Sequence, residues 1–274
     1  MRAVADRLPK RARRAALIAS WRAYERWLVL TGESSAESAP SGTDDWPLPP
    51  ARHRVTVVGD PGPAYFLRSG KGQVDLVKRL LDRNSITLDA SQEILDFGCG
   101  CGRMARWWPT VSDSRLFGCD YNLTLVEWCS ENLTFMEAQG TGLEPPLPYE
   151  DGKFALIYAL SVFTHLSSDL EQAWLSELRR VLAPGGYLFF SVAGSDFERD
   201  LTPGELSDYK AGEAVVRFPE GAGSNLCATF HPPEYVRTRM LTGLEEVDSY
   251  TPVRDESDRM RGPLRQDAYL VRGA

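Results

Sequence analysis

Apolar segments of two kinds alternate along the middle of the chain. The short apolar runs, which are typical of buried strands, end at Phe97, Cys119, Leu160 and Val192, and a further short strand, third in chain order, is expected around 133–138. The segments with apolar side chains at helical spacing are Val74–Leu81, Leu123–Asn132 and Ser168–Val181, the last opening on a capping-box pattern, Ser168 to Glu171. Strands that alternate with helices predict a mainly parallel sheet with helices on both faces.

The stretch from Gly194 to Phe230 breaks this alternation. Within it, 214–218 and 225–230 have the pattern of two strands joined by a turn, which predicts a hairpin. We expect this insertion, residues 194–230, to form a lid at the edge of the sheet where a ligand binds. After it, Pro233 begins a predicted helix to about Leu241, and 244–250 and 268–272 supply the last two strands.

The segment ILDFGCGCGR, residues 94–103, places glycine at every second position after the first strand. Gly98, Gly100 and Gly102 can take backbone conformations that side chains forbid, so the main chain can press against a ligand. The helix-compatible stretch that follows, 103–108, would direct free N–H groups at that ligand. The third glycine of a dinucleotide-binding G-x-G-x-x-G motif would fall at position 103, which is Arg103 and therefore argues against NAD.

A second acidic residue, Asp120, ends the apolar run at 116–119, about twenty residues past the glycines. A carboxylate at this place accepts hydrogen bonds from both hydroxyls of a ribose and repels a 2′-phosphate. We therefore expect a ligand with a free ribose.

Four segments together resemble the class I S-adenosylmethionine-dependent methyltransferases: ILDFGCGCGR, FGCDYN, PPLPYEDGKFALIYALSVFTHL and LRRVLAPGGYLFFSV. The resemblance covers roughly residues 60–272. It implies a Rossmann-like fold with a seven-stranded, mostly parallel sheet, S-adenosylmethionine as the cofactor, and transfer of its methyl group to an acceptor. It divides the chain into an N-terminal helix with a flexible linker, residues 1–50, and a methyltransferase domain, residues 51–274.

The resemblance also assigns cofactor contacts along the sheet edge. The end of the fourth strand would border the methyl group, the loop after the third strand would approach adenine, and the turn-rich segment 55–72 would fold over the mouth of the site. The residues implied are Ser69, Gly70, Asp96, Gly98, Cys99, Gly100, Gly102, Arg103, Asp120, Tyr121, Gly142, Leu143, Leu160 and Ser161.

Methyl transfer needs a base only if the acceptor must lose a proton to react. His165, after the fourth strand, and His231, after the insertion, are the candidate catalytic residues, and a structural role at a helix start is an equal alternative for His165. Four aromatic residues are candidates for the acceptor pocket or, alternatively, for the core: Tyr65, Tyr209, Phe230 and Tyr235.

The charge and the cysteines limit the partners. The net charge is −7, but residues 1–30 hold eight Arg or Lys against Asp6 and Glu25, which leaves −13 for the rest. A body this acidic is a poor nucleic-acid binder. The five cysteines lack the spacing of a disulfide framework or a zinc site, so we expect buried free thiols, no metal and a cytoplasmic protein.

The N-terminal stretch predicts an amphipathic helix with Leu17, Trp21, Tyr24 and Leu28 on one side. The favoured interpretation is that it packs on its own domain or on a second subunit of a homodimer. Peripheral attachment to an anionic membrane is the less favoured one.

A small-molecule methyltransferase is the leading hypothesis, with a sugar or secondary metabolite as the acceptor and O-methylation favoured. Two alternatives stay open: a non-catalytic S-adenosylmethionine-binding module that acts through a protein partner, and an NAD-linked oxidoreductase.

Overall fold

The computed structural model describes residues 19–20, 23–31, 45–255, 257 and 260–273. Its main sheet has seven strands in the order β3-β2-β1-β4-β5-β11-β8. Strands β1 to β5 pair in parallel, whereas β11 is antiparallel to both of its neighbours, β5 and β8. The strands are β1 Glu93–Phe97, β2 Arg115–Asp120, β3 Met136–Gly140, β4 Phe154–Ala159, β5 Leu182–Val192, β8 Leu244–Tyr250 and β11 Asp267–Gly273. The predicted Rossmann-like, seven-stranded fold is confirmed.

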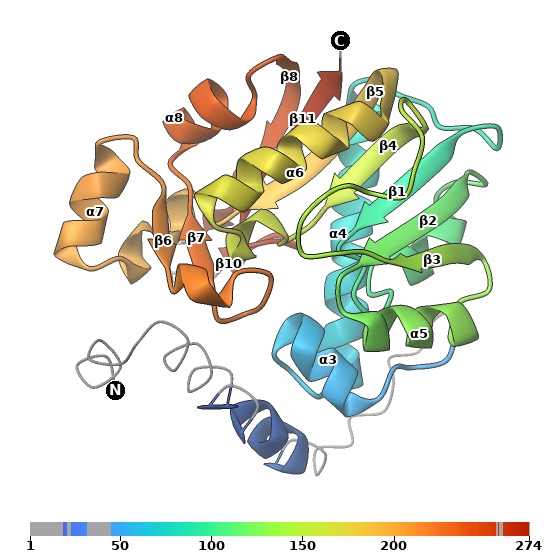
Figure 1. Ribbon diagram of the computed structural model, residues 1–274, viewed down its shortest axis with the longest axis horizontal. Coiled ribbons are helices and arrows are strands. Elements are labelled where there is room, and N and C mark those ends of the chain that lie inside the picture. Colours follow the sequence, from blue (N-terminus) through green and yellow to red (C-terminus); the bar gives the residue numbers. More distant parts are fainter. Residues whose placement is uncertain (1–18, 21–22, 32–44, 256, 258–259, 274) are drawn as a thin grey trace.

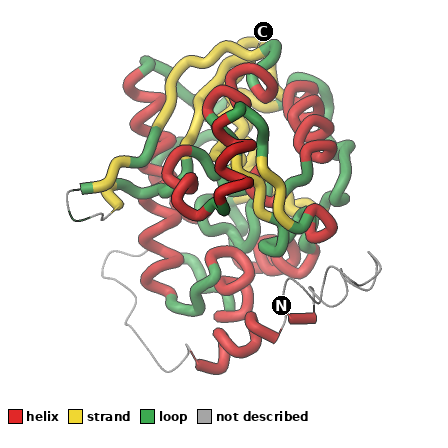
Figure 2. Tube along the Cα trace, turned by 90° about the vertical axis from the view of Figure 1, so that its left-hand side faces the viewer, coloured by secondary structure: helices red, strands yellow, loops and turns green. Residues whose placement is uncertain are grey.

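Helices cover both faces of this sheet, and each face has its own apolar core (Figure 1). Alternation along the strands divides the side chains: Ile94 of β1 packs into one core, and its neighbour Leu95 packs into the other. The first core contains α4 Pro63–Arg83, η1 Ala105–Thr110 and α5 Leu123–Asn132, and the second contains α6 Ser168–Val181 and η5 Val236–Met240. Figure 2 shows the strands from the side, with helices around them.

The insertion, residues 194–230, forms a small unit beside the sheet (Figure 1). The predicted hairpin is present: β6 Val215–Arg217 pairs antiparallel with β7 Ala228–Phe230. The remaining elements of the unit are η3 Ser195–Asp200, α7 Pro203–Lys210 and η4 Pro219–Gly221, and α8 Pro233–Tyr235 follows it. The loop between β6 and β7 returns to the sheet edge, where the Gly223 N–H donates to the His165 carbonyl at 2.8 Å.

Two predictions about local structure are wrong. Residues 55–72, which were expected to be rich in turns, are mostly parts of two helices, α3 Ala51–Val58 and α4, joined by residues 59–62, where Gly59 has φ +70°. The turn signals there mark this short joint and the proline at the first position of α4, where proline is tolerated. The capping box at 168–171 does not form, because Ser167 is the N-cap and the Glu171 carboxylate is bonded elsewhere.

Residues 23–31 are helical and lie on the outside of the molecule next to α3, coloured dark blue in Figure 1. Of the four residues predicted for its apolar side, Leu17 and Trp21 fall outside the described residues. Part of the predicted linker is packed, since the Trp46 and Phe135 rings lie 4.6 Å apart. Within the described residues, no helix is long and apolar enough to cross a membrane.

Candidate functional site

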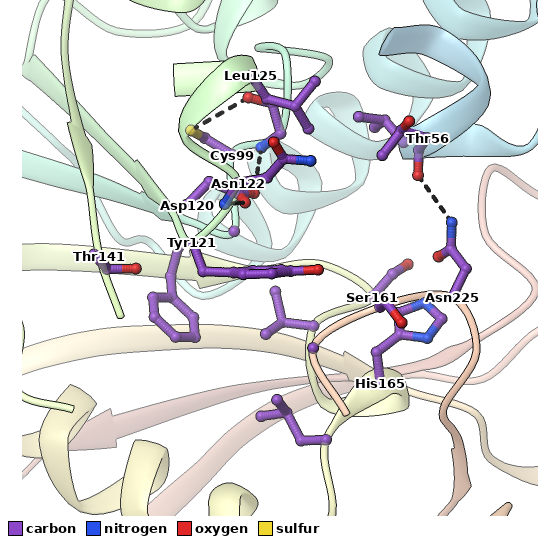
Figure 3. A pocket seen from close by; sticks show the side chains of 18 of the residues that line it. Thr56, Cys99, Asp120, Tyr121, Asn122, Leu125, Thr141, Ser161, His165 and Asn225 are labelled. Carbon is purple, nitrogen blue, oxygen red and sulfur yellow. Dashed lines mark hydrogen bonds between the residues drawn. The ribbon is translucent and has the colours of Figure 1, made fainter. Parts of the chain in front are cut away.

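A cavity of about 490 Å³ lies at the carboxyl ends of β1, β2 and β4 (Figure 3). Three further segments complete its wall: the helix at residues 23–31 through Glu25, the end of α3 at Thr56 and Val57, and residues 221–226 of the insertion. In open parallel sheets, ligands bind at this edge, beyond the carboxyl ends of the strands.

The glycine turn forms the floor of this cavity, and Gly98 and Gly100 line it. All three glycines of the turn have positive φ: +77° at Gly98, +54° at Gly100 and +74° at Gly102. The N–H groups of Gly98 and Cys99 donate to the Cys119 carbonyl of β2, at 2.8 and 3.0 Å, and fix the turn to the neighbouring strand. Gly102, the third glycine of the turn, does not line the cavity. It packs against the core instead, because a Cβ at this position would lie 2.2 Å from Leu133 Cδ1.

Asp120 joins the ends of β2 and the glycine turn. Its Oδ2 accepts from the Gly100 N–H at 2.9 Å, and its Oδ1 accepts from the Asn122 N–H at 2.8 Å. Burial raises the pKa of this carboxyl, while the backbone donors oppose the shift. Each carboxylate oxygen has a second lone pair, so the side chain can still accept from a ligand in the cavity.

Asp96 and Arg103 lie deeper in the same cavity. Asp96 is buried, its Oδ2 has no hydrogen-bond partner, and burial raises its pKa to about 7. The Arg103 guanidinium is buried and bonds to Gln73 of α4, and burial lowers its pKa. A buried carboxyl oxygen without a partner, in a residue that lines a cavity, is suited to receive a polar or cationic group of a ligand.

Another part of the cavity wall lies beyond the ends of β2 and β3. Tyr121 and Leu143 line it, and the Tyr121 side chain is 44% exposed, with its ring lying across the opening in Figure 3. Leu143 is held by α6, because its carbonyl accepts from Trp174 Nε1 at 3.0 Å. Thr141 and Gly142 lie beside it on the same wall.

Leu160 and Ser161 follow β4 and face the middle of the cavity. Ser161 adopts φ +62°, and its N–H donates to Ser191 Oγ at 2.9 Å while its hydroxyl donates to Gln266 Oε1 at 3.0 Å. Bonds to two other segments of the chain therefore hold this left-handed turn at the cavity wall.

His165 also lines the cavity, near Ser161 and Asn225 (Figure 3). Its Nδ1 lies 2.8 Å from the Cys227 carbonyl, which can only accept, so Nδ1 carries the proton and the neutral ring presents Nε2 as an acceptor. Burial lowers the pKa of His165, which favours the neutral form.

The structure does not support a catalytic role for His231. Its side chain is fully buried, it does not line the cavity, and its Nε2 lies 2.5 Å from Glu171 Oε2 on α6. Glu171 also accepts from the Tyr235 hydroxyl at 3.1 Å. His231 therefore ties the end of the insertion to α6, which explains why the predicted capping box is absent.

Six other predicted residues do not line the cavity either. Tyr65 is exposed on α4, Tyr235 bonds to Glu171, and Tyr209 and Phe230 form the core of the insertion. Ser69 donates to the Phe66 carbonyl inside α4, and Gly70 packs against the Arg103 backbone. The placements of Tyr65, Ser69 and Gly70 follow from the helical structure of 63–83, which the turn signals concealed.

Sequence reasoning did not name several residues that line the cavity: Glu25, Thr56, Val57, Asn122, Val162 and Asn225. Thr56 and Val57 lie in the segment expected to fold over the mouth of the site, and Asn122 and Val162 adjoin predicted residues, whereas only tertiary contacts bring in Glu25 and Asn225. Asn225 of the insertion donates to the Thr56 carbonyl at 2.9 Å and closes one side of the cavity (Figure 3). No local sequence motif marks Asn225 or Thr56 as a cavity residue.

As predicted, all five cysteines are free and buried. In the part of the chain that the structure describes, no group of three or more His, Cys, Asp or Glu residues is arranged to hold a metal ion.

Comparison with known families agrees with this geometry. Residues 95–190, which run from β1 through β5, match the family model described as a methyltransferase domain. Residues 95–190 are therefore a methyltransferase domain, and the fold around them is that of the S-adenosylmethionine-dependent methyltransferases. The matched segment contains the glycine turn, Asp120, Ser161 and His165, so it covers most of the cavity wall.

Relatives and solved structures extend the comparison. Tocopherol O-methyltransferase of Arabidopsis thaliana is 24% identical over 60% of this chain and 45% of its own length. The chain covers less than half the length of the curated relatives it matches. A methyltransferase from Methanosarcina mazei superposes with a TM-score of 0.51 at 17% identity, over 70% of this chain and 96% of that one. The [4+2]-cyclase SpnF superposes with a TM-score of 0.53 at 16% identity, over 92% and 94%. At such identities the likeness concerns the fold.

The residues of this cavity fit S-adenosylmethionine, the cofactor of the family. The glycine turn leaves room for close approach of a ligand, Asp120 is placed to accept from ribose hydroxyls, and the unpartnered Oδ2 of Asp96 suits an ammonium group. Together with the match to a methyltransferase domain, this identifies the cofactor as S-adenosylmethionine.

Proposed function

We propose that this chain transfers the methyl group of S-adenosylmethionine to a small-molecule acceptor held in the same cavity. One observation carries the proposal: the residues that fit the cofactor and the neutral His165 line a single cavity, and residues 221–226 of the insertion form part of its wall. A wall of this kind suits a discrete acceptor more than an extended polymer.

In this proposal the chain mainly binds and aligns the two reactants. Asp120 holds the ribose hydroxyls, Asp96 receives the amino-acid end of the cofactor, and Tyr121 with Leu143 contacts the adenine. When bound, the cofactor would supply an electrophilic methyl carbon; attack by the acceptor in line with the C–S bond would transfer the methyl group and leave the demethylated thioether, S-adenosylhomocysteine. Alignment of two reactants can contribute about 7–11 kcal/mol in favourable cases.

His165 gives the proposal its reaction type. A hydroxyl acceptor has a high pKa and gains from a base that removes its proton during transfer. The neutral ring, with Nδ1 bonded to the Cys227 carbonyl, presents Nε2 for this role. We therefore favour O-methylation, the reaction for which the tocopherol relative is named, and a sugar or secondary metabolite as the acceptor.

The insertion, residues 194–230, serves as a lid in this proposal, and residues 51–274 act as the methyltransferase domain. The support is the set of hydrogen bonds that join residues 223–227 to the rest of the cavity: Gly223 and Cys227 to His165, and Asn225 to Thr56.

The proposal is tested by incubating the protein with methyl-labelled S-adenosylmethionine and pools of small molecules. Label in a low-molecular-weight product that depends on the protein supports it. Tight cofactor binding without turnover on any pool, together with a stable protein partner, would favour the non-catalytic module. Product without label would indicate a reaction other than methyl transfer, such as the cyclisation for which SpnF is named.

Asp120→Ala should weaken S-adenosylmethionine binding by about 1.5–3 kcal/mol, the range for a hydrogen bond to a charged group. The variant also loses the acceptor for the Gly100 N–H, so the glycine turn should loosen. Calorimetric titration measures the effect. The matched control is Asp75→Ala, which removes an exposed carboxylate paired with Lys71 on α4 and should leave affinity unchanged. Normal affinity in Asp120→Ala would remove the ribose assignment.

A further inference from the structure

The helix at residues 23–31 has two different faces. Glu25, Leu28 and Val29 are half-buried, and Glu25 faces the body, where the Thr56 hydroxyl lies 3.4 Å from its carboxylate. The opposite face carries Tyr24, Trp27 and Leu30. These three residues are spaced three apart, which places them on one side of a helix.

This outer face is apolar and solvent-exposed. Tyr24 is 47% exposed, Trp27 56% and Leu30 80%, and the two aromatic rings stack with their centroids 5.9 Å apart. These three residues are among the large apolar side chains that are exposed in the described part of the chain, and they lie together on one short helix. Clustered exposed apolar residues of this kind mark an interaction surface. Tyr24 is therefore not packed on its own domain, and packing on a second subunit, the other part of the prediction, stays a prediction.

The charge of the same segment indicates the partner. Residues 1–30 carry eight Arg or Lys against two carboxylates, and Arg26 is exposed on this helix. The remainder of the chain carries −13. An anionic surface would attract this end of the molecule and repel the rest, which sets the orientation of docking. A two-fold contact between copies would instead bring two positively charged segments together.

We propose that the outer face of helix 23–31, formed by Tyr24, Trp27 and Leu30, docks on a lipid bilayer with anionic headgroups. Tryptophan and tyrosine suit the boundary between headgroups and acyl chains, and neighbouring Arg and Lys add attraction to anionic lipids. Because Glu25, on the other face, lines the cavity, docking holds the cavity mouth about one helix diameter, ~10–12 Å, from the headgroups.

The test is co-sedimentation of the full chain with vesicles of phosphatidylcholine alone and of phosphatidylcholine mixed with phosphatidylglycerol. We expect binding at least about tenfold stronger to the mixed vesicles, weakened by high salt. The double variant Trp27→Ser/Leu30→Ser should lose about tenfold or more of this affinity, because each side chain no longer buries apolar surface in the lipid. Arg26→Glu should weaken binding to the mixed vesicles and leave the apolar face intact.

The matched control is Val253→Ser, which removes an exposed apolar side chain, 63% exposed, from β9 Val253–Arg254. It should bind vesicles like the parent chain, and all variants should keep the parent melting temperature. Equal binding to neutral and mixed vesicles, or unchanged binding of the double variant, would overturn the proposal. Absence of vesicle binding, together with a dimer that the double variant converts to a monomer, would assign the face to a second copy of the chain instead.

Discussion

Gly100→Val is expected to abolish binding of S-adenosylmethionine, lowering its affinity at least about a hundredfold. Gly100 has φ +54°, which a β-branched residue avoids at a cost of about 1–3 kcal/mol, and a Cβ would lie 2.8 Å from Val57 Cγ2 of α3. The turn must then shift, and the Gly100 N–H leaves Asp120. The added side chain therefore weakens cofactor binding indirectly, because its contact with α3 displaces the glycine turn.

The control for this prediction is Gly243→Val. Gly243 has φ +77°, nothing lies within 4 Å of the place that a Cβ would take, and it does not line the cavity. It reproduces the backbone strain without the crowding, so it should lower the melting temperature and leave cofactor affinity near normal. Calorimetric titration of both variants, with melting curves, separates the two effects. A folded Gly100→Val protein with parent affinity would show that the glycine turn is not the cofactor site.

His165→Ala is expected to slow single-turnover methyl transfer about 100- to 10,000-fold, the range for loss of a general base, while cofactor affinity stays near normal. The prediction rests on the Nδ1 bond to the Cys227 carbonyl, which presents Nε2 as an acceptor in the cavity. His53→Ala is the control, because His53 is a buried histidine of α3 that does not line the cavity.

The pH dependence gives a second measurement. A base acts in its neutral form, and burial lowers the pKa of His165 below its ordinary value of 6.5. The parent rate should therefore be flat above neutral pH and fall only at acidic pH, and His165→Ala should lack this fall. A near-normal rate in His165→Ala with an unchanged pH profile would mean that alignment alone drives the transfer and that the histidine is structural.

Local sequence patterns were sufficient for the sheet and the cofactor half of the cavity. The apolar runs of β1, β2, β4 and β5 are buried on both faces, so they are recognisable without their partners. Glycines at every second position and the acidic residue at the end of β2 act within their own turns. For this reason Gly98, Gly100 and Asp120 line the cavity as predicted.

The residues predicted for an acceptor pocket were placed by tertiary structure. Tyr209 and Phe230 fill the core of the insertion, Tyr235 bonds to Glu171, and Tyr65 lies exposed on α4. His231 is buried against the same Glu171 carboxylate. An aromatic or histidine side chain has no local signal that separates a core position from a cavity wall, because its burial depends on elements far away in the chain.

The sequence by itself determined the alternation of strands and helices, the glycine turn with Asp120, and the family to which these motifs belong. Only the tertiary structure decided that α3, Asn225 of the insertion and Glu25 complete the cavity, and that Tyr24, Trp27 and Leu30 remain outside it. The physical reason is the range of the interactions. A turn or an apolar run is set by neighbouring residues, whereas a cavity wall is set by contacts such as that between Thr56 and Asn225, which join segments far apart in the sequence.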